Sequence, residues 1–112
     1  MNVVFHCSSG DGADHGHALA NARNLLADDT VTVDELAVVF NGEAVRAVAE
    51  NAPHADEIRG ITDDVRFVAC SNSLASRDLP PETLVDGVEL GSSGVGTVVK
   101  LQAAGYHYVK VP

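Results

Sequence analysis

Two cysteines are the residues of this sequence with the clearest capacity for chemistry. Cys70 directly follows an apolar run at residues 66–69 and precedes the small polar residues Ser71 and Asn72. A thiol at the start of a helix lies near unpaired N–H groups and the positive end of the helix dipole. Such a setting can lower a thiol pKa from about 8.5 to roughly 3.5–7.5 and so enrich the nucleophilic thiolate. A buried, inert cysteine is the alternative, and the local sequence leaves both open.

Cys7 offers a weaker case, because it ends an apolar run that enters a loop of Ser, Gly and Asp. It would serve as a resolving partner only if its strand end lies near Cys70, and plain core packing is the favoured interpretation. Asp11 and Asp14 follow it closely and would disfavour a nearby thiolate. We therefore predict that Cys70, and not Cys7, is the reactive thiol.

The histidines near the N-terminus invite a metal hypothesis that their spacing does not support. His6 and Cys7 are adjacent in a predicted strand and should point to opposite faces. His15 and His17 stand two apart at a helix start, so they do not share a face. The spacing of a structural zinc site is absent, and we expect no resident metal.

The glycine-rich loop at residues 10–16 (GDGADHG) nearly matches a dinucleotide-binding loop. Its third glycine falls one place late, and acidic residues and a histidine would face the pyrophosphate. The chain also lacks a P-loop lysine, so we expect no nucleotide and no other cofactor.

The elements that must position these residues alternate along the whole chain. Short apolar, β-branched runs predict strands at residues 3–7, 31–40, 66–69, 88–90 and 106–111. Helical spacing and capping residues predict helices at residues 14–28 (with Asp14 as a cap), 44–51, 71–77 and 95–104, and a further turn or two at 54–61. This alternation predicts one α/β domain over residues 1–112, with a mostly parallel five-stranded sheet covered on both faces. The order of the strands is not predicted.

Small polar residues follow each predicted strand, at the edge where open parallel sheets bind their ligands. The candidate binding residues at this edge are Asn41, Gly42, Ser71, Asn72, Ser92, Ser93 and Gly94. Backbone N–H groups gather near Gly94, where a helix begins, and would favour an anion there. The sequence thus predicts a crevice with Cys70 as its reactive centre.

The charge of the chain limits its partners. Sixteen acidic residues and seven basic ones give a formal net charge of −9, which repels phosphate backbones and argues against nucleic-acid binding. The acids either keep the surface soluble or adapt it to a salt-rich cytoplasm, where screening weakens self-repulsion. No apolar run approaches a membrane span, and no secretory signal is visible, so we expect a cytoplasmic protein without a membrane partner. A core this small would also benefit from self-association.

Several segments resemble the DsrE/DsrF-like family, in order and over essentially the whole chain. They are residues 3–6 (VVFH), 21–26 (NARNLL), 38–42 (VVFNG), 67–74 (FVACSNSL) and 101–108 (LQAAGYHY). The segment around Cys70 and the closing Gln-x-x-Gly-Tyr-x-Tyr pattern are the most specific. The chain resembles the small stand-alone branch of the family.

The resemblance implies a three-layer α/β/α domain that forms homotrimers or homohexamers. It also implies a sulfur-relay protein, a possible sulfurtransferase, that carries sulfane sulfur as a cysteine persulfide between donor and acceptor proteins. Cys70 matches the position of the sulfur-carrying cysteine. The alternative hypothesis is a non-catalytic module that uses the same crevice to bind a small anion or a peptide.

Overall fold

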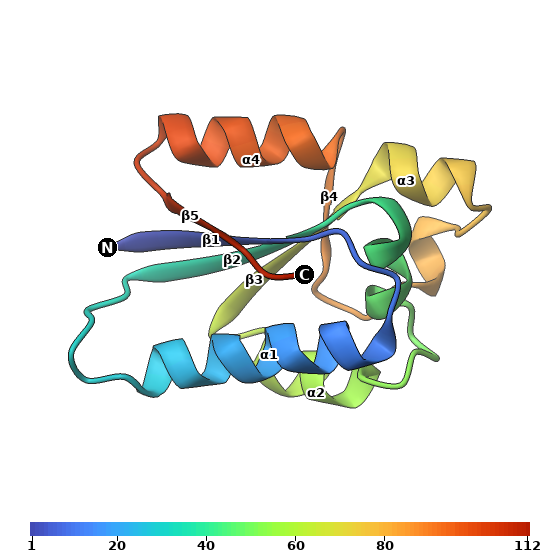
Figure 1. Ribbon diagram of the computed structural model, residues 1–112. Helices are drawn as coiled ribbons and strands as arrows, with labels where there is room; N and C mark the ends of the chain where they lie inside the picture. Colours follow the sequence, from blue (N-terminus) through green and yellow to red (C-terminus); the bar gives the residue numbers. More distant parts are fainter.

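Strands and helices alternate through the computed structural model, which describes all residues 1–112 (Figure 1). The strands are β1 (Asn2–Cys7), β2 (Glu35–Phe40), β3 (Val65–Cys70), β4 (Glu89–Gly91) and β5 (His107–Lys110). The helices are α1 (Gly12–Ala27), α2 (Ala55–Ile61), α3 (Ser71–Ser76) and α4 (Gly94–Ala103), with 3₁₀ segments η1 (Gly42–Val48) and η2 (Pro81–Thr83). None of the helices combines the length and the apolar character that a membrane crossing requires.

The five strands form one sheet in the order β4-β3-β2-β1-β5, and every neighbouring pair is parallel. Helices α1 and α2 lie below the sheet in Figure 1, whereas α4 lies above it. The predicted α/β fold, with a five-stranded parallel sheet covered on both faces, is therefore confirmed. Because all strands run the same way, their carboxyl ends meet at one edge of the sheet.

The central strands are apolar on both faces, as expected of a parallel sheet that helices cover on both sides. The face below α4 packs Val4, Ala37, Val39 and Val68 against Val98 and Leu101. The opposite face contributes to a larger cluster, in which the Phe40 and Phe67 rings stack with centroids 6.1 Å apart. Full burial of side chains of this size contributes about 1.5–3 kcal/mol each, so this two-sided core is the main source of stability.

Several predicted boundaries were wrong, each for a local reason. The second strand begins at Glu35 and not at residue 31, because its partner β1 begins at Asn2, which is paired with Glu35. The first helix begins at Gly12, and its cap is Asp11, whose side chain accepts the Ala13 N–H. Asp14 instead accepts a hydrogen bond from the Ser9 hydroxyl, 2.6 Å away.

Two further predicted elements differ in type or position. The helix predicted at residues 44–51 is the 3₁₀ segment η1, in which four of the seven residues are buried. A 3₁₀ segment is usually short, and this one ends before an extended residue, Ala49. The fourth strand is shifted by one residue to Glu89–Gly91, where its pairing with β3 sets the register.

Candidate functional site

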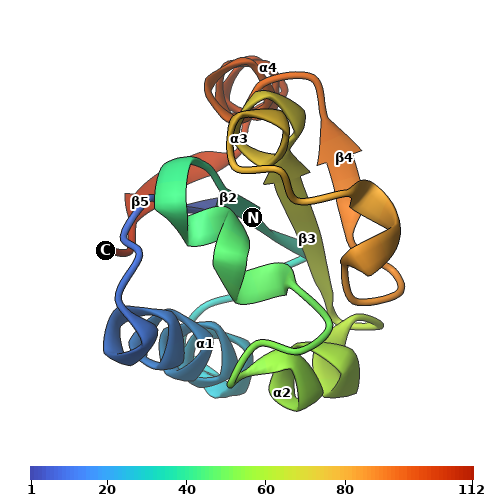
Figure 2. The same cartoon turned by 90° about the vertical axis from the view of Figure 1, so that its right-hand side faces the viewer.

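The carboxyl edge of the sheet, onto which Figure 2 looks, carries the candidate site. Cys70 ends β3, and Asn41 directly follows the neighbouring strand β2. Ser93 and Gly94 follow β4 on the other side of β3 and begin α4. The strand order thus places residues far apart in the sequence around one cysteine.

Cys70 is the residue on which α3 begins. Its backbone is extended, and its Sγ accepts the N–H of Ser73 at 3.4 Å. Gly94 approaches closely from the start of α4: a Cβ placed on Gly94 would lie 3.2 Å from the Cys70 Cβ and 2.6 Å from the Asn41 Cβ. Only a residue without a side chain fits between these two neighbours, so α4 can begin directly beside the cysteine.

Hydrogen-bond donors make this thiol more acidic than usual. Burial of Cys70, which is 5% exposed, by itself raises the pKa. The Ser73 hydroxyl and the backbone N–H groups of Ser73, Gly94 and Asn72 more than offset this effect, so the Cys70 pKa is lowered. Because those donors stabilise the charged form, they favour the nucleophilic thiolate.

Cys7 has the opposite environment. It is fully buried in the core, on the face of the sheet that α1 covers, and its S–H donates to the Pro112 carbonyl at 3.2 Å. Burial raises the Cys7 pKa, and the Asp14 charge adds to this effect, whereas a hydrogen bond from Ser9 and the Lys110 charge oppose it. The two cysteines therefore differ in the direction of their pKa shifts.

The structure brings together most, but not all, of the predicted binding residues. Asn41 and Gly94 flank Cys70, Asn72 supplies a backbone N–H, and Ser93 caps α4 by accepting the Gly96 N–H at 2.9 Å. Gly42 has a left-handed backbone (φ 59°) and donates its N–H to the Ser73 hydroxyl at 2.8 Å. It therefore supports the site indirectly.

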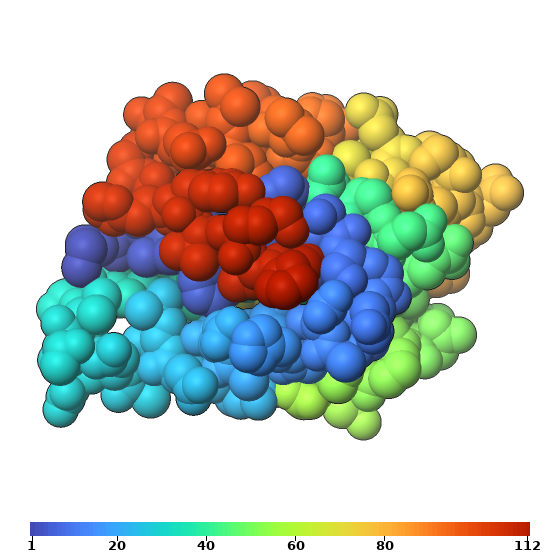
Figure 3. Space-filling model, in the orientation of Figure 1, coloured from blue at the N-terminus to red at the C-terminus, as the bar shows by residue number.

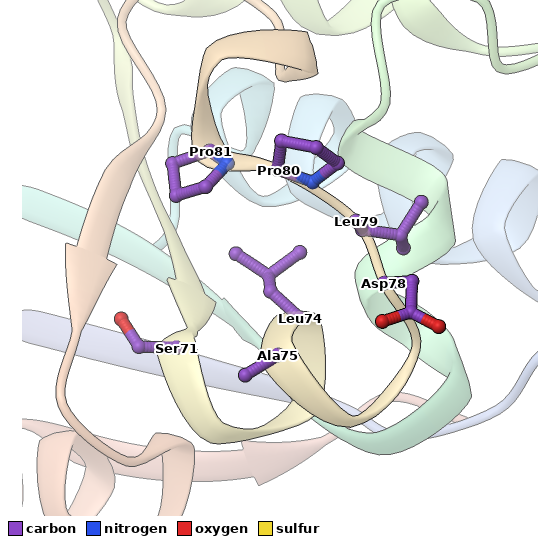
Figure 4. Close-up of a pocket in the computed structure, with 7 residues that line it drawn as sticks. All are labelled: Ser71, Leu74, Ala75, Asp78, Leu79, Pro80 and Pro81. Carbon is purple, nitrogen blue, oxygen red and sulfur yellow. The ribbon is translucent and has the colours of Figure 1, made fainter.

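Two predicted residues lie away from the sulfur. Ser92 is exposed in the turn before α4 and makes no hydrogen bond through its side chain. Ser71 lines an open, mainly apolar groove of about 330 Å³ on the outer side of α3. Figure 4 shows Leu74 pointing into this groove toward Pro80 and Pro81.

Three polar residues of the site were missed by the sequence prediction. Ser73, the third residue of the helix that Cys70 begins, was signalled by its position, where a small polar side chain commonly bonds to the capping residue. His6 and Tyr108 form a hydrogen-bonded chain with Asn41: the His6 ring joins the Tyr108 hydroxyl at 2.8 Å and the Asn41 Oδ1 at 2.7 Å. The alternation of side chains along β1 predicted that His6 and Cys7 point to opposite faces of the sheet. Only the strand order brings Tyr108 beside His6.

No group of three or more His, Cys, Asp or Glu side chains is arranged to hold a metal ion. His15 and His54 instead make hydrogen bonds to backbone carbonyls. His15 is buried and donates to the Ser9 carbonyl at 2.6 Å, whereas His17 is exposed. His54 joins the Gly12 carbonyl at 3.0 Å.

Comparison with known proteins agrees with this architecture. The DsrE/DsrF-like family matches the sequence over residues 1–111. The chain belongs to the DsrE/DsrF-like family. Among solved structures, the chain is similar to MTH1491, a protein of unknown function from Methanobacterium thermoautotrophicum. That structure shares 33% sequence identity and a TM-score of 0.90 with this one, over 97% of each chain.

The YchN protein from E. coli has the same fold at greater distance. Its crystal structure has a TM-score of 0.76 and 15% identity, over 98% of this chain and 99% of that one. At this identity the likeness shows the fold alone. No curated protein matches the chain.

Proposed function

We propose that this DsrE/DsrF-like protein carries sulfane sulfur as a persulfide on Cys70, between a donor protein and an acceptor protein. The observation that carries the proposal is the set of donors around Sγ, which comes from α3 and from the start of α4. These groups lower the thiol pKa, and thiolate is the form that attacks sulfur. Membership of a family associated with sulfur relay supports the same activity.

The reaction is two successive displacements at sulfur. The Cys70 thiolate attacks the terminal sulfur of the donor's persulfide, the donor S–S bond breaks, and the donor leaves as a thiolate. An acceptor thiolate then attacks the sulfur bound to Cys70, and Cys70 leaves as a thiolate. No electrons are gained or lost overall. The same hydrogen bonds stabilise the Cys70 thiolate before the first step and after the second.

The experiment that tests this function is persulfide loading. The protein is incubated with polysulfide, and intact mass is measured with and without a reductant. We expect a reducible gain of one or more sulfur atoms that peptide mapping places on Cys70. The matched controls are Cys70→Ser, which should not load, and Cys7→Ser, which should. A wild-type protein that gains no sulfur would leave the non-catalytic binding module as the better explanation.

Self-association belongs to the same proposal. Val95 and Val99 lie four residues apart on the outer side of α4 and are 61% and 59% exposed. Tyr108 and Val109 of the edge strand β5 are also exposed, and Figure 3 shows the red surface of the C-terminal segment next to the orange surface of α4. An exposed apolar surface of this kind suits contact with a second copy, as a trimer or hexamer. Light scattering at micromolar concentration should give a multiple of the 11.7 kDa chain mass, and a monomer mass would contradict the assembly.

A further inference from the structure

We propose that His6 and Tyr108 are positioning residues, which fix the Asn41 side chain so that its NH₂ group faces the sulfur bound to Cys70. The inference rests on the proposed function and adds a defined hydrogen-bonded chain to it. In this proposal Asn41 supplies the hydrogen-bond donor to the sulfur. His6 and Tyr108 orient the Asn41 side chain without contacting the cysteine.

One face of the sheet carries all four residues. His6, Asn41 and Cys70 each lie two positions after a residue that packs beneath α4, namely Val4, Val39 and Val68. Side chains two apart along an extended chain point to the same face. They therefore stand side by side on β1, β2 and β3.

Tyr108 completes the row from the edge strand β5. It is paired with Val4 across β1 and β5, so its side chain lies on that same face. Its hydroxyl reaches the His6 Nδ1 at 2.8 Å, and the two rings lie 5.9 Å apart between centroids. Four adjacent strands thus contribute one side chain each to a polar row that ends at Cys70.

The chemistry of the groups fixes the direction of the hydrogen bonds. A carbonyl oxygen only accepts, so the His6 Nε2 must carry a proton and donate to the Asn41 Oδ1 at 2.7 Å. In the neutral imidazole Nδ1 is then an acceptor, and the Tyr108 hydroxyl donates to it. The Asn41 Oδ1 thus sets the tautomer of His6, and the Tyr108 hydroxyl, which can donate, is compatible with it and holds the ring in place.

This arrangement leaves the donor side of the Asn41 amide unused. Its Oδ1 is occupied by His6, which makes the one hydrogen bond of this side chain, and its NH₂ group is not a buried donor without a partner, so it is open to solvent or to a ligand. The Asn41 Cβ and the Cys70 Cβ both lie beside Gly94, at 2.6 Å and 3.2 Å from the place where a Cβ on that residue would stand. The free N–H groups are therefore available to the sulfur carried on Cys70, where they would stabilise the negative charge that develops as the S–S bond breaks during transfer.

The functional test compares the rate at which persulfidated Cys70 gives its sulfur to glutathione. Asn41→Ala should slow this release about tenfold, as expected for one hydrogen bond to a charged group. His6→Leu should slow it similarly, and the double variant should be no slower than either single one, because both remove the same interaction. His6→Gln, which keeps an N–H near the Nε2 position, should restore most of the rate. Effects of His6→Leu and Asn41→Ala that multiply in the double variant would overturn the proposal.

Tyr108→Phe provides a milder perturbation at an exposed position, and it keeps the proposal testable if His6→Leu does not fold. It should slow sulfur release about threefold, since His6 remains but is less well oriented. The matched controls are Tyr106→Phe and His17→Leu, which remove the same chemical groups outside the row and should leave the rate unchanged. An unchanged rate of sulfur release in Tyr108→Phe would show that Tyr108 has no positioning role in the hydrogen-bonded row.

An NMR readout separates this inference from the proposed function. At mildly alkaline pH, nitrogen shifts of the His6 ring should show the proton on Nε2, and the Asn41 NH₂ signals should change in His6→Leu. If wild-type Cys70 takes up no sulfur, the proposed function fails. The spectra would still show whether His6 is bonded to Asn41 and orients its side chain. A proton on Nδ1, or Asn41 signals that ignore His6, would refute the positioning role itself.

Discussion

Removal of the Ser73 hydroxyl is the sharpest test of why Cys70 is acidic. The hydroxyl has the largest lowering effect on the Cys70 pKa, and its oxygen accepts the Gly42 N–H at 2.8 Å. A hydrogen bond to a charged group contributes about 1.5–3 kcal/mol, and one pKa unit corresponds to about 1.4 kcal/mol. Ser73→Ala should therefore raise the Cys70 pKa and slow labelling of Cys70 at neutral pH at least about tenfold, while the backbone donors of α3 and α4 remain.

The measurement is the rate of iodoacetamide labelling of Cys70 against pH, followed site by site by mass spectrometry. Ser73→Thr keeps the hydroxyl and should keep the profile. Ser76→Ala removes a hydroxyl that donates to the Ser73 carbonyl and not to the sulfur, so it is the matched control. If Ser73→Ala leaves the labelling pKa unchanged, or Ser76→Ala shifts it equally, the hydroxyl is not the cause.

The stability of the same variant should depend on pH in a defined direction. A lowered pKa in the folded state stabilises the fold above the unfolded thiol pKa, and this contribution is lost as pH falls through the folded-state value. Ser73→Ala should reduce that pH-dependent contribution. It should also lower stability at every pH by about 1–3 kcal/mol, because the Gly42 N–H loses its partner. Urea unfolding at several pH values separates the two effects.

Three other predictions concern the second thiol, the glycine beside the site and the surface charge. Iodoacetamide should label Cys70 well before Cys7 at neutral pH. Because burial raises the Cys7 pKa, the contribution of this thiol to stability is present below the unfolded thiol pKa of about 8.5 and is lost at higher pH. Urea unfolding of Cys7→Ala should therefore lack this loss of stability at high pH. Gly94→Ala should lower the free energy of unfolding by about 1–3 kcal/mol, because the new Cβ would lie 2.6 Å from that of Asn41. The control Gly60→Ala meets open space and should not destabilise the fold, and equal stabilities of the two variants would contradict the close packing at Gly94. The unfolding temperature should rise between dilute buffer and molar chloride if the net charge of −9 is an adaptation to salt, and a flat or falling temperature would leave only a solubilising surface.

The order of elements and the place of Cys70 at the start of a helix could be predicted from the sequence, because both depend on local patterns. Apolar runs in β1, β2 and β3 are the direct signature of strands buried on both faces. A cysteine placed between such a run and a helical segment must lie near helix N–H groups, whatever the rest of the fold does. Boundaries were less well predicted, since the start of β2 depends on where its partner β1 begins.

The completion of the site was decided by the tertiary structure alone. Strand order sets β4 beside β3 and thereby brings Gly94 against Cys70, although 24 positions separate them in the sequence. The same order sets β5 beside β1 and joins Tyr108 to His6, which no local pattern relates. The exposure of β4 and β5 is typical of edge strands, but no local pattern shows which edge each strand occupies, because that depends on how the whole sheet packs against its helices. The sequence by itself thus singled out the candidate cysteine, and only the packed sheet determined which residues surround it.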